Sequence, residues 1–113
     1  MYFQDKNVLV TGGGRGIGRT TALEFANGGA NVAVADIDKS NANMTAEDIH
    51  RKGRRAIGLK VDVGNIKEIN LMVEETVSSL GGIDIFFNNA GITKHIDFFD
   101  IEEADWDQIN RVN

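Results

Sequence analysis

The sequence contains no cysteine, which excludes a disulfide framework, a thiolate metal site and a cysteine nucleophile. It also contains no proline, so no helix is broken by a missing backbone N–H. No apolar run approaches the ~18 residues of a membrane span, and the N-terminus lacks the apolar core of a signal peptide. We therefore expect a cytoplasmic protein without a membrane segment.

Positive charge is also scarce in this sequence. The 12 Lys and Arg residues stand against 17 Asp and Glu, for a net charge of −5. A surface for nucleic acid or anionic membrane needs clustered Lys and Arg, and the single basic run, RKGRR at 51–55, is interpreted as a solvated helix end. We expect neither nucleic acid nor membrane as a partner, and no pattern of His, Asp and Glu indicates a metal site.

What the sequence does contain is an alternation of apolar strands and helices. Its 113 residues suit one domain, residues 1–113. Strands are predicted over 7–11, 31–36, 56–63 and 83–91, and helices over 17–27, 40–52, 66–80 and from Asp100 onward. Such alternation predicts an α/β fold with parallel strands joined by right-handed crossovers. We expect the first half of a Rossmann-type doubly wound parallel sheet, with strand order 3-2-1-4 and a ligand at the carboxyl ends of the strands.

A glycine cluster lies between the first strand and the first helix. Gly12, Gly16 and Gly18 have the spacing G-x-x-x-G-x-G. Without side chains, the backbone can turn tightly and a pyrophosphate can approach the positive end of the helix. A tight strand–helix turn without a ligand would use the same glycines, so the cluster alone leaves both interpretations open.

Asp36 favours the nucleotide interpretation. It ends the second strand eighteen residues after Gly18, near the roughly 20-residue offset of an acid that binds an adenosine ribose. A carboxylate there would repel a 2′-phosphate, which favours NAD over NADP. Arg15 is a counter-signal because its guanidinium could attract that phosphate. We predict NAD; a helix cap or turn is the alternative role for Asp36.

A phosphate loop is a competing match. Residues 13–20, GGRGIGRT, fit G-x-x-x-x-G-K-[ST] except that Arg19 replaces the lysine. In a phosphate loop that lysine reaches the β- and γ-phosphates. The missing lysine and the acid after the second strand both count against a nucleoside-triphosphatase.

Four motifs together resemble the short-chain dehydrogenase/reductase family. They are TGGGRGIG at 11–18, AD at 35–36, DV at 62–63 and NNAG at 88–91, and DWDQINRVN at the end is similar to the segment leading into that family's central helix. The resemblance covers essentially the whole chain. It implies hydride transfer between a nicotinamide cofactor and an alcohol or carbonyl substrate, and a homodimer or homotetramer for the intact protein.

The resemblance assigns cofactor-binding roles to residues that follow each strand. The matching residues are Thr11, Gly12, Arg15, Gly16, Ile17, Gly18, Asp36, Ile37, Asp62, Val63, Asn89, Ala90, Gly91 and Ile92. Thr11 would tie the glycine turn together. Asp62 would accept a hydrogen bond from the adenine amino group, and the Val63 amide would donate to the ring. Residues 89–91 would pass along the ribose, with Ile92 near the nicotinamide.

The family's catalytic group is only partly present. Asn113 matches its asparagine, which holds a water in a proton relay, but the catalytic serine and the Tyr-x-x-x-Lys motif are absent. The single tyrosine, Tyr2, precedes the first strand. His95 is a weak candidate to replace it, and His50 is expected to face solvent.

We therefore expect the chain to be the cofactor-binding half of a longer NAD-dependent enzyme, without catalysis of its own. The apolar strand at 83–91 agrees with this, because it would otherwise be an exposed edge. A self-standing dinucleotide-binding module is the alternative. The substrate stays open.

Overall fold

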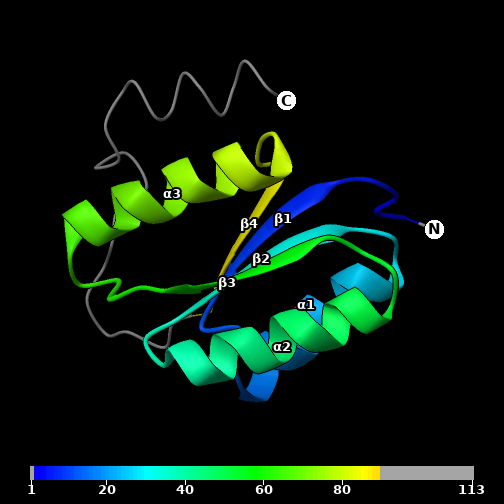
Figure 1. The fold of residues 1–113 in the computed structure, drawn as a ribbon, viewed down its shortest axis with the longest axis horizontal. Coiled ribbons are helices and arrows are strands. Elements are labelled where there is room, and N and C mark those ends of the chain that lie inside the picture. Colours follow the sequence, from blue (N-terminus) through cyan, green and yellow to red (C-terminus); the bar gives the residue numbers. More distant parts are fainter. Residues whose placement is uncertain (1, 90–113) are drawn as a thin grey trace.

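The computed structural model describes residues 2–89, in which strands and helices alternate (Figure 1). The elements are β1 (Asn7–Thr11), α1 (Gly16–Asn27), β2 (Asn31–Asp36), α2 (Lys39–Arg51), β3 (Ala56–Lys60), α3 (Ile66–Leu80) and β4 (Ile85–Asn88). The helix expected from Asp100 lies outside the described residues, as do Ala90, Gly91, Ile92, His95 and Asn113.

The four strands form one parallel sheet with the order β3-β2-β1-β4, which confirms the predicted topology. Leu9 in β1 pairs with Ala33 on one side and with Phe86 on the other. Helices α1 and α2 cover one face of the sheet and α3 covers the other (Figure 1). The chain thus leaves β1 toward β2 on one side and returns to β4 on the other, which creates a switch point at the carboxyl end of β1.

Successive side chains of β1 enter two separate hydrophobic clusters. Val8 and Val10 pack with α1 and α2, whereas Leu9 packs with α3. All three are fully buried, as expected for a strand covered on both faces. The core of the described residues is therefore a layer of side chains on each side of the sheet.

Close packing of α2 on β3 depends on a glycine. A Cβ built on Gly58 would lie 2.4 Å from Asn43 Oδ1 and 3.0 Å from the Asn43 backbone nitrogen. The missing side chain lets the first turns of α2 lie directly against the edge strand. Buried Ala42 and Ala46 continue this close contact along the helix.

Several predicted boundaries are shifted by local side-chain hydrogen bonds. β3 ends at Lys60, not at residue 63, because Asp62 Oδ1 accepts a hydrogen bond from the Gly64 amide at 2.9 Å and turns the chain. α2 begins at Lys39, one residue earlier than predicted, because Asp38 caps it by accepting from the Asn41 amide.

Ile17, which the resemblance assigns to the cofactor site, lies in the first turn of α1 and its side chain is 73% exposed. The fourth strand, expected over 83–91, spans Ile85–Asn88. It is one of the two edge strands of the described sheet, with Ile85, Phe86 and Phe87 only half-buried.

Candidate functional site

The glycine turn between β1 and α1 lies at the carboxyl edge of the sheet. Gly12 and Gly16 have φ values of +65° and +60°, in the left-handed region that favours glycine. No atom of the described residues comes within 4 Å of a Cβ built on Gly16, so this point of the turn is open. The turn therefore presents bare backbone beside the switch point.

Gly18 allows the start of α1 to approach the turn closely. A Cβ on Gly18 would lie 1.9 Å from the Gly12 carbonyl oxygen and 2.9 Å from Asn89 Nδ2. Any side chain at Gly18 would thus collide with backbone that cannot move independently. The structure brings together Gly12, Gly18 and Asn89, three of the predicted site residues.

The N-terminus of α1 differs from those of the other two helices. Asp38 caps α2 and Asn65 caps α3, whereas Arg15, the cap residue of α1, makes no side-chain capping bond within residues 2–89. The first N–H groups of a helix have no partner in the helix and carry its positive dipole end. Arg15 and Ile17 are exposed beside them, so this helix start can accept an anion.

The Thr11 hydroxyl joins β1 to the end of β4. It donates to Asn88 Oδ1 at 2.7 Å and accepts from the Asn89 amide at 3.1 Å. The hydroxyl thus positions the Asn88–Asn89 segment, and the expected role of Thr11 in holding the glycine turn together stays a prediction. Sequence reasoning did not single out Asn88, although it lies within the NNAG motif.

The Asp36 carboxylate connects two loops at the same edge. Oδ2 accepts from the Gly14 amide in the glycine turn, and Oδ1 accepts from the Asp38 amide before α2, each at 3.0 Å. Asp36 is 6% exposed, whereas neighbouring Ile37 is largely exposed. The turn-forming role and a ligand-binding role are compatible, because a carboxylate has about four acceptor sites.

Asp62 and Val63 lie in the loop between β3 and α3. Asp62 is exposed and its carboxylate accepts from Gly64 in the same loop. Val63 is half-buried and packs against the cluster under α3. The Asp62 carboxylate thus bonds within its own loop and the Asp62 amide donates to Glu68 Oε1 of α3 at 3.0 Å, whereas the Asp36 carboxylate contacts the glycine turn directly.

Arg19 points from α1 to α2, away from the glycine turn. Its guanidinium donates to Thr45 Oγ1 at 2.9 Å and forms an ion pair with Asp48. The hydrogen bond from Arg19 lowers the pKa of the Asp48 carboxyl below its ordinary value, against a smaller opposing effect of burial. Because Arg19 is held by α2, it does not take the role of a phosphate-loop lysine.

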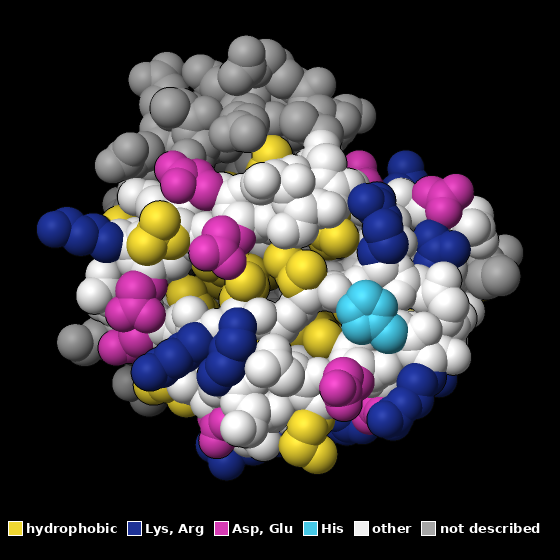
Figure 2. All heavy atoms as spheres, viewed as in Figure 1, with side chains coloured by type: hydrophobic (Ala, Val, Ile, Leu, Met, Phe, Trp, Pro, Cys, Tyr) yellow, Lys and Arg dark blue, Asp and Glu magenta, His cyan; other side chains and the backbone are white. Residues whose placement is uncertain are grey.

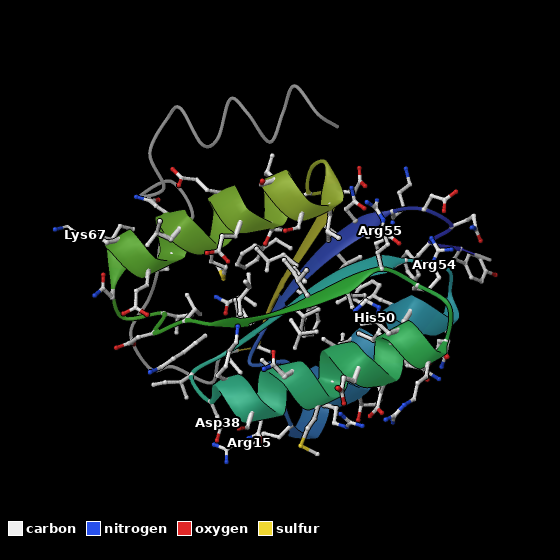
Figure 3. All side chains as sticks on the ribbon, viewed as in Figure 1. Arg15, Asp38, His50, Arg54, Arg55 and Lys67 are labelled. Carbon is white, nitrogen blue, oxygen red and sulfur yellow. The ribbon has the colours of Figure 1, made fainter. Side chains whose placement is uncertain are left out.

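Figure 3 places Asp38 and Arg15 at the start of α2, with His50 toward its other end. His50 is exposed, as predicted.

A hollow separate from the glycine turn lies at the open edge of β3, between α2 and α3. It has a volume of about 360 Å³ and is lined by Lys39, Leu59, Lys60, Glu68, Leu71, Met72 and Glu75. In Figure 2, hydrophobic side chains are visible at the surface of this hollow. None of the predicted site residues lines it, so it is separate from the glycine turn.

A parallel sheet ordered β3-β2-β1-β4, with a glycine turn after β1 and an acid after β2, defines the dinucleotide-binding class of α/β fold. Sequence comparison agrees: the family model described as short chain dehydrogenase matches residues 6–113. The chain belongs to the short chain dehydrogenase family.

Similar proteins include dehydrogenases of known structure. The chain is 38% identical, over all its 113 residues and 46% of the relative, to (2S)-[(R)-hydroxy(phenyl)methyl]succinyl-CoA dehydrogenase subunit BbsD of Thauera aromatica. A short chain dehydrogenase from Burkholderia cenocepacia in complex with NADP superposes with a TM-score of 0.78 at 34% identity, covering 99% of this chain and 46% of that one. A 7α-hydroxysteroid dehydrogenase complexed with NADH and 7-oxo glycochenodeoxycholic acid gives 0.78 at 28% identity, covering 97% and 47%. The chain thus spans less than half the length of these relatives.

In the part of the chain that the structure describes, no helix is long and apolar enough to cross a membrane.

Proposed function

We propose that this chain binds NAD as the cofactor-binding part of an alcohol dehydrogenase or ketone reductase. The observation that carries the proposal is the position of Asp36: a buried carboxylate hydrogen-bonded to the glycine turn at the carboxyl edge of the sheet. A fixed negative charge there accepts hydrogen bonds from ribose hydroxyls and repels a 2′-phosphate. Family membership supports a nicotinamide dinucleotide, and the solved relatives include both an NADP and an NADH complex.

The residues present fit such a cofactor. The uncapped first turn of α1 offers N–H groups for the pyrophosphate, and the open space at Gly16 leaves room for it. We assign the adenosine ribose to Asp36 and Ile37, and the adenine to Asp62 and Val63. When bound, the nicotinamide would supply the hydride acceptor or donor.

Toward the nicotinamide, the family pattern assigns Asn89 together with three residues outside the described range, Ala90, Gly91 and Ile92. Asn89 is held against Gly18 and Thr11. We assign Asn113, also outside that range, the family's water-holding role in the intact enzyme. The substrate of that enzyme would be a small alcohol or carbonyl compound, and its assembly a homodimer or homotetramer in the cytoplasm.

Titration of the purified chain with NADH and with NADPH tests the cofactor. We expect NADH to bind more tightly, and Asp36→Ala to remove most of that preference. Glu47→Ala is the matched control, because it deletes one acidic charge from the exposed face of α2 and should leave the preference unchanged. Tighter binding of NADPH by the unmodified chain would refute the assignment of NAD.

Catalysis is a separate question. Since the catalytic serine and the Tyr-x-x-x-Lys pair are absent from these 113 residues, we expect no oxidation of alcohols or reduction of ketones by the chain alone. Turnover above the cofactor-only background would contradict this.

A self-standing dinucleotide-binding module is the second candidate. The two apolar clusters closing over both faces of the sheet within residues 2–89 favour it. It predicts a monodisperse chain that unfolds cooperatively, whereas aggregation or a loss of fixed packing would count against it. Mg²⁺-dependent ATP hydrolysis by the chain would instead support the phosphate-loop nucleotidase.

A further inference from the structure

The orientation of the Asp36 carboxylate is set by two backbone amides from different loops. The Gly14 amide holds Oδ2 and the Asp38 amide holds Oδ1. The Asp38 amide lies in the same turn as Asp36, only two residues along the chain, so the two groups move together. The Gly14 amide is the tie between Asp36 and the glycine turn.

Gly14 is packed tightly between Asp36 and the first turn of α2. A Cβ built on Gly14 would lie 2.8 Å from Asp36 Oδ2, 2.6 Å from Asn41 Cβ and 2.9 Å from the Asn41 carbonyl carbon. Its φ is not among the positive values found at other glycines, so the need for glycine here is steric. Gly14 thus differs from Gly12 and Gly16, where the backbone conformation itself favours glycine.

We propose that Gly14 is a positioning residue for cofactor choice: its amide, and its lack of a side chain, hold the Asp36 carboxylate in the orientation that favours NAD over NADP. The inference rests on the proposed function and adds a residue to it. Asp36 supplies the charge, and Gly14, backed by Asn41, decides where that charge lies.

A side chain at position 14 would press on both Asn41 and Asp36, and it would displace the group that moves more easily. Asn41 meets it with Cβ and backbone atoms of a helix that is capped by Asp38. The Asp36 carboxylate can rotate about its own side-chain bonds, so it is the group that yields. A displaced carboxylate loses hydrogen bonds to ribose and repels a 2′-phosphate less, while the exposed Arg15 next to Gly14 still attracts that phosphate.

The test is the ratio of the dissociation constants for NADPH and NADH, measured by calorimetric titration of the chain. We expect Gly14→Ala to weaken NADH binding about tenfold, as for loss of a hydrogen bond to a charged group. NADPH binding should change little, so the ratio should fall by a similar factor. A purely structural defect would weaken both cofactors alike and leave the ratio unchanged.

Gly13→Ala is the matched control. Its added Cβ would meet side-chain methyl groups of Val34 and Val10, at 2.8 and 3.2 Å, and not Asp36. We expect it to alter both dissociation constants by the same factor. A preserved ratio in Gly14→Ala, or an equal fall in Gly13→Ala, overturns the inference.

A double variant carries the test if Gly14→Ala does not fold. Asn41→Gly removes the Cβ behind Gly14, but the Asn41 carbonyl carbon stays, so an alanine at position 14 is accommodated only in part and still presses on Asp36. We expect the double variant to fold. Its ratio of the NADPH and NADH dissociation constants should be lower than that of Asn41→Gly alone. Where Gly14→Ala also folds, the ratio of the double variant should be higher than that of Gly14→Ala. A ratio equal to that of Asn41→Gly alone overturns the inference. Failure of the unmodified chain to bind either cofactor would instead refute the proposed function.

Discussion

The side-chain hydroxyl of Thr11 lies 2.7 Å from Asn88 Oδ1, across the adjacent parallel strands β1 and β4. The same hydroxyl accepts a hydrogen bond from the Asn89 amide. Thr11 itself is 1% exposed, whereas Asn88 lies at the exposed end of β4. This pair fixes the two strand ends between which the switch point lies, and Asn89 is thereby held beside Gly18.

Replacing Thr11 with valine should therefore cost stability as well as position. Thr11→Val keeps the shape of the side chain but removes two part-buried hydrogen bonds, while the Asn89 amide keeps the Thr11 carbonyl as an acceptor at 3.2 Å, so we expect a loss of about 1 kcal/mol. Chemical denaturation of the chain measures this loss. Thr76→Val is the control: Thr76 is fully buried, but its hydroxyl donates to the Met72 carbonyl within α3, which has its own helical N–H partner. An equal loss in both variants would mean that the β1–β4 link has no special role.

The glycines of the turn should differ in their sensitivity to alanine. The added methyl group of Gly16→Ala would lie in open space. The free energy of unfolding should therefore fall only because alanine disfavours the left-handed backbone, by about 1–2 kcal/mol. Gly18→Ala would place Cβ against the Gly12 carbonyl and must displace the turn or α1, which we expect to cost more than 2 kcal/mol. Thermal unfolding of both variants ranks them, and a Gly18→Ala variant as stable as Gly16→Ala would contradict the close approach.

The ion pair between Arg19 and Asp48 should make stability depend on acid pH. The pKa of Asp48 is lowered in the folded chain, chiefly by its hydrogen bond from Arg19. A lowered folded pKa means that the contribution is complete above the unfolded value of about 3.9 and is lost as pH falls through the folded value. Asp48→Asn should thus melt at a lower temperature than the unmodified chain at pH 7.

The difference in melting temperature should shrink toward zero as the pH falls through the lowered folded pKa of Asp48. Glu47→Gln neutralises the preceding acid, which is exposed on α2, and should show a smaller difference at pH 7. A difference for Asp48→Asn that stays constant from neutral to acid pH would show that the ion pair contributes nothing.

Lys39, at the start of α2, covers a backbone carbonyl on the open edge of the sheet, and we expect it to protect that edge. Its ammonium group donates to the Gly58 carbonyl of edge strand β3 at 2.7 Å. Lysines on edge strands discourage pairing between sheets of different molecules. Lys39→Met should therefore increase the apparent mass of the chain in sedimentation at high concentration. Lys67→Met makes the same chemical change at an exposed lysine on α3 (Figure 3) and should not. If both variants have the same apparent mass in sedimentation, Lys39 does not protect the edge of the sheet.

Element types and strand order were predictable because they depend on local pattern. Apolar runs bounded by glycine, alternating with helical periodicity, leave few topologies once crossovers are right-handed. The helix starts were predicted less well, and β3 was predicted too long, since Asp38 and Asp62 turn the chain by side-chain hydrogen bonds that compete with regular structure.

The sequence by itself determined the fold and the family, and it placed the glycine turn and Asp36 at the carboxyl edge, because chain order and glycine spacing dictate that edge. Only the tertiary structure decided which of these groups touch. Thr11 meets Asn88 across 77 residues, Gly14 meets Asp36 across 22, and Arg19 meets Asp48 across 29. Such contacts depend on strand register and helix packing, which arise from burial of the whole core and cannot be read from any one segment.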